Sequence, residues 1–145
     1  MKHTKSRNGF TLIELIIVMV ILGIMAAVAV PRYLDSISNA EEAAEDAVIS
    51  AIRSGLTQYA NNSLYESGRA EWPTNPFDVL AEKPVGYSTD TDDADVDGEW
   101  TFTGTRITHQ RADNSRFEWS YDQGIPGGGD DAVIGTLGER VKITP

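Results

Sequence analysis

An uncharged apolar stretch from Leu15 to Val30 constrains the fold of this chain more than any other feature of its sequence. With the residues just before it, this stretch makes an apolar segment of 21 residues, Phe10–Val30. A helix of that length is roughly 30 Å long, which is enough to cross the hydrocarbon core of a bilayer. The sequence therefore predicts a transmembrane helix over residues 10–30.

A short basic segment precedes the apolar run and contains Lys2, Lys5 and Arg7. A basic start before an apolar run is typical of an export signal, and its positive charge keeps the N-terminus in the cytoplasm. An ordinary signal peptide would carry a small-residue cleavage site after the run, and the sequence has none there. The obvious small residue is Gly9, before the run, so cleavage there would keep the helix in the mature protein.

Glu14 places a carboxylate one turn into the predicted membrane helix. Such an acid costs at least ~2.5 kcal/mol on insertion scales, so it usually has a functional partner. After cleavage at Gly9, the free ammonium of Phe10 would be such a partner, because opposite charges within ~4–6 Å favour each other's ionised forms. Such pairs are best attested as devices that fix the register between helices. The alternative is that Glu14 lies at the headgroups and only orients a single helix.

The sequence Gly9-Phe10-Thr11-Leu12-Ile13-Glu14-Leu15 resembles the prepilin motif of type IV pilins and type II secretion pseudopilins. This resemblance implies that residues 1–9 are a leader, that prepilin peptidase cleaves after Gly9, and that Phe10 is then N-methylated. It also implies that Glu14 pairs with the terminal amine of a neighbouring subunit during assembly.

Gly23 and Pro31 interrupt the apolar segment. Proline removes a helical hydrogen bond and kinks the helix, and glycine loosens it. In a lone membrane span these residues could be incidental. The corresponding segment of pilin filaments is often locally unwound, so the resemblance implies that Gly23–Pro31 lengthens on assembly.

An amphipathic helix is predicted over residues 31–60, ended by Asn61-Asn62-Ser63, because Asn and Ser favour turns. Its apolar residues recur at three- and four-residue steps: Tyr33, Ile37, Ala40, Ala44, Val48, Ile52, Leu56 and Tyr59. The carboxylates between them are predicted to face water: Glu41, Glu42, Glu45 and Asp46. The apolar stripe is interpreted as the spine on which a sheet packs, since it lacks the strict heptads of a coiled coil.

Residues 61–145 are predicted to form a globular α+β head. Alternating patterns favour strands at 100–102, 106–111 and 116–121, which would form an antiparallel meander, and a last strand at 140–143. The Pro-bounded loop 72–77 is expected to lead into a short helical turn over 78–80. A helix followed by antiparallel strands is an α+β order, and the resemblance to type IV pilins implies a long N-terminal helix packed on a small sheet.

Two acidic segments of the predicted head are candidate Ca²⁺ sites. Asp93, Asp95 and Asp97, followed by Gly98, match the first half of an EF-hand loop, but Gly104 stands where the bidentate glutamate belongs. Asp130 and Asp131 follow a glycine run that is loosely similar to the calcium-binding loop of major pseudopilins. The alternative for both segments is a solvated turn that needs no ligand.

Several other functions find no support in the sequence. The formal net charge of −10 argues against direct binding of nucleic acid, which needs clustered Lys and Arg. The absence of cysteine excludes disulfides, including the C-terminal bridge of many type IV pilins, and thiolate sites. His109 is assigned to the polar face of a strand, and no catalytic motif is present, so we expect no enzyme.

The favoured interpretation is a structural subunit of a type IV pilus that serves adhesion, motility or DNA uptake. Its expected partners are identical or homologous pilin subunits, prepilin peptidase, the pilus assembly machinery and the membrane. We expect a single-pass inner-membrane precursor with a cytoplasmic N-terminus, which then enters an extracellular filament. Two alternatives stay open: a type II secretion pseudopilin, and a membrane-tethered calcium-binding domain that does not polymerise.

Overall fold

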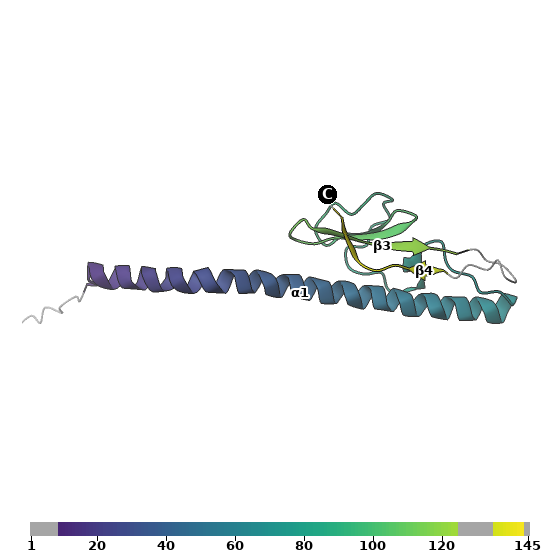
Figure 1. The fold of residues 1–145 in the computed structure, drawn as a ribbon, viewed down its shortest axis with the longest axis horizontal. Helices are drawn as coiled ribbons and strands as arrows, with labels where there is room; N and C mark the ends of the chain where they lie inside the picture. Colours follow the sequence, from purple (N-terminus) through teal and green to yellow (C-terminus); the bar gives the residue numbers. More distant parts are fainter. Residues whose placement is uncertain (1–8, 125–134, 144–145) are drawn as a thin grey trace, which may run out of the picture. The chain divides into compact units, whose positions relative to one another are not determined.

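The computed structural model describes residues 9–124 and 135–143 of the chain. The chain divides into two units, an N-terminal unit, Met1–Glu42, and a globular unit, Ala43–Pro145. A single helix, α1 (Leu12–Ser67), contains 56 residues and belongs to both units (Figure 1). Among the described residues, α1 is the one helix that is long and apolar enough to span a membrane.

Helix α1 is continuous through both residues that interrupt the apolar pattern, Gly23 and Pro31. Proline inside a helix costs roughly 3 kcal/mol relative to alanine, and glycine about 1 kcal/mol, and a helix of 56 residues accommodates both. The segment predicted as transmembrane is therefore helical from Leu12 onward, and its crossing of a membrane stays a prediction. The lengthening of Gly23–Pro31 on assembly stays a prediction about the filament.

The predicted end of the helix at Asn61-Asn62-Ser63 is wrong, because α1 continues to Ser67. Asn and Ser inside a helix each cost less than about 0.7 kcal/mol relative to alanine, which is too little to stop a packed helix. The stop comes from Gly68, whose φ of 74° is left-handed and whose N–H donates to the Leu64 carbonyl at 3.0 Å. A glycine with this hydrogen bond forms a common C-terminal cap.

The antiparallel meander predicted from the alternating pattern is confirmed in the globular unit. It consists of β1 (Trp100–Phe102), β2 (Arg106–Gln110) and β3 (Arg116–Asp122), with Phe102 opposite Ile107 and Ile107 opposite Trp119. The expected helical turn is also present, as the 3₁₀ turn η1 (Pro76–Val79), which begins two residues earlier than predicted.

Two short strands complete the sheet, and both pair with β3. The predicted last strand is β5 (Val141–Ile143), whereas β4 (Thr136–Leu137) was not predicted. Strands β3 and β4 are labelled in the globular unit in Figure 1. Two residues are too few to show a strand period, so β4 left no signal in the sequence.

The core lies between α1 and one face of the sheet. Ile52, Ile107 and Phe77 are fully buried, and each such side chain contributes about 1.5–3 kcal/mol through burial. The rest of the core cluster comes from α1, β1 and β3: Ile49, Leu56, Trp100, Phe102, Trp119 and Tyr121. Gly55 lets η1 approach the helix, because a Cβ there would lie 2.5 Å from Cγ2 of Val79.

The opposite face of the sheet is covered by the loop before β1. Ala94 is fully buried there, and its N–H donates to Oγ1 of Thr108 at 2.8 Å. The Thr108 hydroxyl also lies 2.7 Å from that of Thr101 on β1. Both faces of β2 are therefore covered, which explains why its residues from Ile107 to Gln110 are all buried.

Candidate assembly helix and polar clusters of the globular unit

The predicted cleavage site lies immediately before α1 and is open to its surroundings. Phe10 is 93% exposed, and a Cβ added at Gly9 would meet nothing within 4 Å. A peptidase could therefore reach this bond in the isolated chain. Cleavage after Gly9 and methylation of Phe10 stay predictions.

Glu14 caps the N-terminus of its own helix. Its carboxylate accepts hydrogen bonds from the Thr11 N–H and the Thr11 hydroxyl, each at 2.8 Å. In return, Oγ1 of Thr11 accepts from the Glu14 N–H at 3.3 Å. This is a capping box, which satisfies backbone donors that the first turn of a helix leaves without partners. The Thr-x-x-Glu spacing signals such a box, and the sequence interpretation overlooked it.

The apolar residues of the N-terminal unit are exposed along the whole predicted transmembrane segment. Phe10, Leu22 and Val30 mark its start, middle and end, and all are exposed. A Cβ at Gly23 would meet no atom within 4 Å. The described part of the chain therefore offers no cover for this segment, which calls for a bilayer or other helices.

A buried charge cluster joins α1 to the far end of the chain, and Glu45 is its centre. Oε1 of Glu45 accepts from Nε of Arg111 at 2.7 Å and Oε2 from Nη2 at 2.6 Å. Oε2 also lies 3.1 Å from Nη1 of Arg140, and Nδ1 of His109 is 2.9 Å from Oε1. Glu45 is fully buried, so the prediction that it faces water is wrong.

His109 also differs from its prediction, because it is buried rather than placed on an ordinary polar face. Its ring stacks on Trp100 with 4.2 Å between the centroids. Phe117 on β3 lies opposite His109, and the Arg111 guanidinium lies 4.0 Å from the centroid of the Phe117 ring. Aromatic rings thus shield the Glu45 cluster, which strengthens each of its hydrogen bonds.

The charges around Glu45 govern its ionisation. Burial opposes the charged form, but hydrogen bonds from Arg111 and His109 outweigh burial and lower the pKa of Glu45 to about 2. The carboxylate is therefore ionised at neutral pH, with both oxygens accepting hydrogen bonds. The cluster connects α1 to His109 and Arg111 at the end of β2 and to Arg140 just before β5. It contains no exposed nucleophile.

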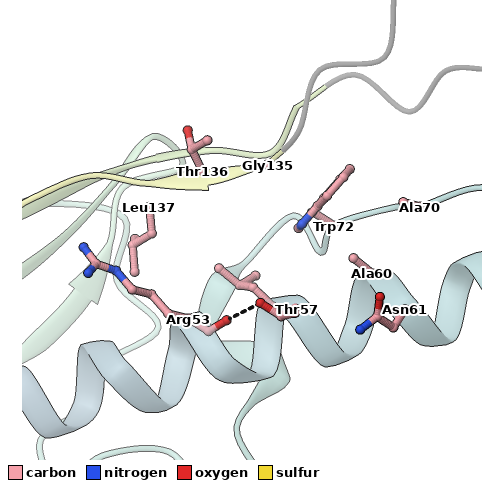
Figure 2. A pocket seen from close by; sticks show the side chains of 10 residues that line it. Arg53, Thr57, Ala60, Asn61, Ala70, Trp72, Gly135, Thr136 and Leu137 are labelled. Carbon is pink, nitrogen blue, oxygen red and sulfur yellow. Dashed lines mark hydrogen bonds between the residues drawn. The ribbon is translucent and has the colours of Figure 1, made fainter. Parts of the chain in front are cut away.

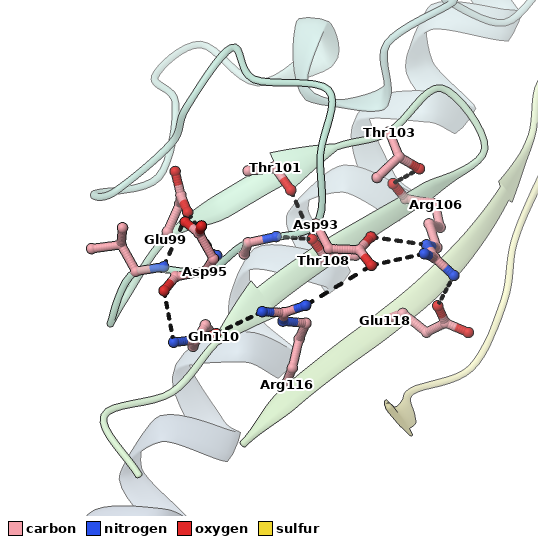
Figure 3. Close-up of polar contacts among 12 residues, drawn as sticks. Asp93, Asp95, Glu99, Thr101, Thr103, Arg106, Thr108, Gln110, Arg116 and Glu118 are labelled. Atoms are coloured by element: carbon pink, nitrogen blue, oxygen red, sulfur yellow. Dashed lines mark hydrogen bonds and ion pairs between the residues drawn. The ribbon is translucent and has the colours of Figure 1, made fainter. Parts of the chain in front are cut away.

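The acidic loop, residues 90–99 before β1, contains the first predicted Ca²⁺ ligands. Asp93 binds Arg106 through both carboxylate oxygens, at 3.1 and 2.8 Å. The backbone of Asp95 is held by Glu99 and Gln110, and Asp97 is exposed. Figure 3 shows Asp93 directed at Arg106, while Asp95 lies beside Glu99 and Gln110.

Within residues 9–124 and 135–143, no group of three or more His, Asp or Glu side chains is arranged to hold a metal ion. The second predicted site, Asp130 and Asp131, lies outside the described residues. Calcium binding by either segment stays a prediction.

A cavity of about 520 Å³ lies between α1, the loop at Trp72 and strand β4 (Figure 2). Its walls are mainly apolar, with Leu56, Trp72 and Leu137, and Arg53 at one end. Arg53 donates to the Gly138 carbonyl at 2.9 Å, so its guanidinium is already held by the protein. The described lining contains no acid–base pair, and no sequence pattern pointed to this cavity.

A long apolar N-terminal helix and a small antiparallel sheet define the class of this chain: it has an α+β, type IV pilin-like arrangement. A family model described as "Prokaryotic N-terminal methylation motif" matches residues 4–30.

Curated relatives agree with this class. The chain is 56% identical over 82 residues to the type IV narrow pilus major component PilA5 of Thermus thermophilus. The matched region covers 57% of this chain and 64% of that protein. It is 41% identical over 69 residues to a fimbrial protein of Neisseria meningitidis, covering 48% and 37% of the two chains. It is also 35% identical over 83 residues to the type II secretion system core protein G of Pseudomonas aeruginosa, covering 57% and 55%.

The matched regions cover less than two thirds of each of these relatives. No solved structure matches the chain significantly. The resemblance to type IV pilins and pseudopilins noted in the sequence is thus supported by the motif and the relatives together.

Proposed function

We propose that this chain is the structural subunit of a type IV pilus filament, serving adhesion, motility or DNA uptake. The observation that carries the proposal is the exposed apolar part of α1, preceded by the exposed Gly9 and capped by Glu14. The proposal is further supported by similarity to proteins named as a pilus component and a fimbrial protein.

In this proposal, prepilin peptidase removes residues 1–9 at the inner membrane, with the N-terminus on the cytoplasmic side. The apolar helix first lies in the bilayer and then moves into a bundle of identical or homologous helices. Both environments are dry and apolar, so the helix can exchange one for the other without exposing its side chains to water. The assembly machinery extracts the subunit, and the acidic globular unit faces outward in the extracellular filament.

Glu14 would gain a second partner during this transfer. Within one chain its carboxylate is satisfied by Thr11. In a bundle, the methylated amine of Phe10 from a neighbouring subunit would bring a positive charge to the same depth. A carboxylate with room for a second donor can accept both, so capping of its own helix and pairing with a neighbour are compatible.

A second candidate function is a type II secretion pseudopilin, favoured by the similarity to the secretion system core protein G. A pseudopilin would use the same helix, but in the cell envelope. The third candidate, a membrane-tethered domain that does not polymerise, lacks a specific observation in its favour.

The deciding experiment is mass spectrometry of the N-terminal peptide in filaments sheared from the native cell surface. An abundant N-methylated Phe10 peptide would support the pilin. Processed protein that stays in the envelope, with none in the sheared fraction, would favour the pseudopilin, and full-length precursor alone would contradict both.

A matched pair of variants separates processing from helix effects. Gly9→Ala should retain residues 1–9, because the peptidase site is lost. Gly23→Ala makes the same chemical change within the apolar segment, where an added Cβ meets nothing, and should be processed normally. Equal processing of both variants would contradict the assigned cleavage site.

A further inference from the structure

The acidic loop is a structural layer of the globular unit. Ala94, within this loop, is fully buried, and its N–H donates to Oγ1 of Thr108 on the outer face of the sheet at 2.8 Å. This loop also carries several carboxylates in a short stretch: Asp90, Asp92, Asp93, Asp95, Asp97 and Glu99. Like charges this close together repel one another, and positive charge nearby lowers that repulsion.

Arg106 provides that charge from within the sheet. Its Nε and Nη2 donate to the two carboxylate oxygens of Asp93, at 3.1 and 2.8 Å, and its Nη1 donates to Glu118 at 2.9 Å. Nη1 of Arg116 lies 4.0 Å from the same Asp93 carboxylate. Two arginines therefore face two carboxylates, and this part of the outer face is locally neutral (Figure 3). A bidentate guanidinium contact is both strong and specific in geometry.

Protein groups hold the rest of the loop as well. Oε2 of Glu99 accepts from the N–H groups of Asp95 and Val96, at 3.0 and 3.3 Å. Gln110 on β2 holds the loop at two points. Its side-chain amide donates to the Asp95 carbonyl at 3.0 Å, and its backbone carbonyl accepts from the Gly98 N–H at 2.8 Å. In a calcium loop the carboxylates converge on one ion. Here the Asp93 and Glu99 carboxylates are directed at different donors, which are a guanidinium and backbone amides.

We infer that Arg106 takes the place of a divalent cation in this loop. Its guanidinium binds Asp93 and Glu118 together, as a metal ion bound by two carboxylates would, and ties the loop to β2 and β3. A guanidinium stays charged at all physiological pH values and cannot dissociate. The loop therefore keeps its fold without Ca²⁺, although its sequence carries half of a calcium-binding pattern. This inference is independent of the proposed pilin function.

The test measures the thermal stability of the full-length protein in detergent micelles with and without Ca²⁺. All proteins in the test carry Asp130→Asn and Asp131→Asn, so that the second candidate Ca²⁺ segment does not contribute. In this background, Tm should change by less than about 1 °C between chelator and millimolar Ca²⁺, because no binding at the acidic loop means no linked stabilisation. Arg106→Gln should lower Tm by several degrees in chelator, and millimolar Ca²⁺ should restore part of that loss, since Asp93 and Glu118 are then freed for a metal ion.

The control variant is Lys142→Gln, which removes the same charge from an exposed position on β5. It should leave Tm nearly unchanged, with or without Ca²⁺. Three outcomes would overturn the inference: a Ca²⁺-dependent rise in Tm of the Asp130→Asn, Asp131→Asn background, equal Tm values for the two variants, or a failure of Ca²⁺ to stabilise Arg106→Gln.

A local measurement keeps the inference testable if Arg106→Gln does not fold. Hydrogen exchange at the Ala94 amide reports the seating of the loop, because that N–H is bonded to Thr108. Asp93→Asn removes the carboxylate charge that the loop contributes to the contact and keeps Arg106 on β2. It should speed exchange at Ala94 several-fold while exchange at Ile107 stays slow. Unchanged exchange at Ala94 would mean that the Arg106–Asp93 contact does not hold the loop.

Discussion

Glu45 and Arg111 form a fully buried, two-point ion pair, with N–O distances of 2.7 and 2.6 Å between α1 and the residue that follows β2. Arg140 joins the same carboxylate at 3.1 Å and also reaches Asp46 at 3.2 Å. The helix is thereby fixed to two parts of the chain by charge as well as by apolar packing. This geometry gives the first prediction.

Replacement of Glu45 by glutamine should destabilise the globular unit strongly. The variant removes the buried carboxylate that accepts from Arg111 and Arg140, and breaking a buried pair in this way costs about 3–5 kcal/mol. Denaturant unfolding of the full-length protein measures the loss. Glu66→Gln is the matched control, since Glu66 is exposed on the same helix and its loss should cost less than about 0.5 kcal/mol. Similar unfolding midpoints for the two variants would contradict the assigned role.

The same pair predicts how stability depends on pH. The pKa of Glu45 falls from its ordinary value of 4.5 to about 2 in the folded protein, so its stabilising effect is complete above pH 4.5. The effect is lost as pH falls through about 2, and the lost amount is roughly 3 kcal/mol. Unfolding free energies measured between pH 5 and pH 2 should fall more steeply for the native protein than for Glu45→Gln. Parallel curves would show that Glu45 does not titrate in this range.

Two variants of Glu14 separate capping from charge. Glutamine keeps a side-chain acceptor for the Thr11 N–H but removes the charge, whereas alanine removes both. If pairing with a neighbour's amine drives assembly, both variants should insert into the membrane and both should lose most surface filaments. Filament counts by electron microscopy and membrane fractionation measure the two steps. Normal filaments from Glu14→Gln would assign capping alone to this residue.

Gly55→Ala tests the close approach of η1 to the helix. The added Cβ would lie 2.5 Å from Cγ2 of Val79, and such overpacking typically costs about 1–3 kcal/mol. Alanine also favours the helix by up to about 1 kcal/mol, so the net loss should be small but measurable by thermal unfolding. Adding Val79→Ala should make the Gly55→Ala change less costly or favourable. A lone Gly55→Ala variant more stable than the native protein would refute the contact.

The elements that the sequence predicted are those with a clear local period. Strands at Trp100–Phe102 and from Arg106 follow a two-residue alternation, and the long helix follows from its apolar run and a three- to four-residue stripe. Ile52 and Leu56 of that stripe are indeed buried. Local patterns of this kind depend only on neighbours in the chain, so they can be read without a structure.

The Glu45 cluster could not be predicted in the same way. The stripe was placed over Ala44 and Val48, whereas the buried residues at that end are Glu45 and Ile49. A carboxylate is assigned to water unless its partner is known, and here the partners are 66 and 95 residues away along the chain. The acidic loop is a similar case. Its pattern of carboxylates suggests a metal ion, but Asp93 binds Arg106, which lies 13 residues further along the chain.

The long reach of the Glu45 cluster also sets the order in which the protein can be completed. Arg140 follows Glu45 by 95 residues along the chain, so Glu45 is synthesised well before this partner. Contacts this distant along the chain form late and slowly. Until Arg140 is present, the Glu45 carboxylate lacks one of its hydrogen-bond donors, and burying a carboxylate that is incompletely paired is costly. Truncation before Arg140 would therefore remove one of the cations that hold the Glu45 carboxylate in its buried position.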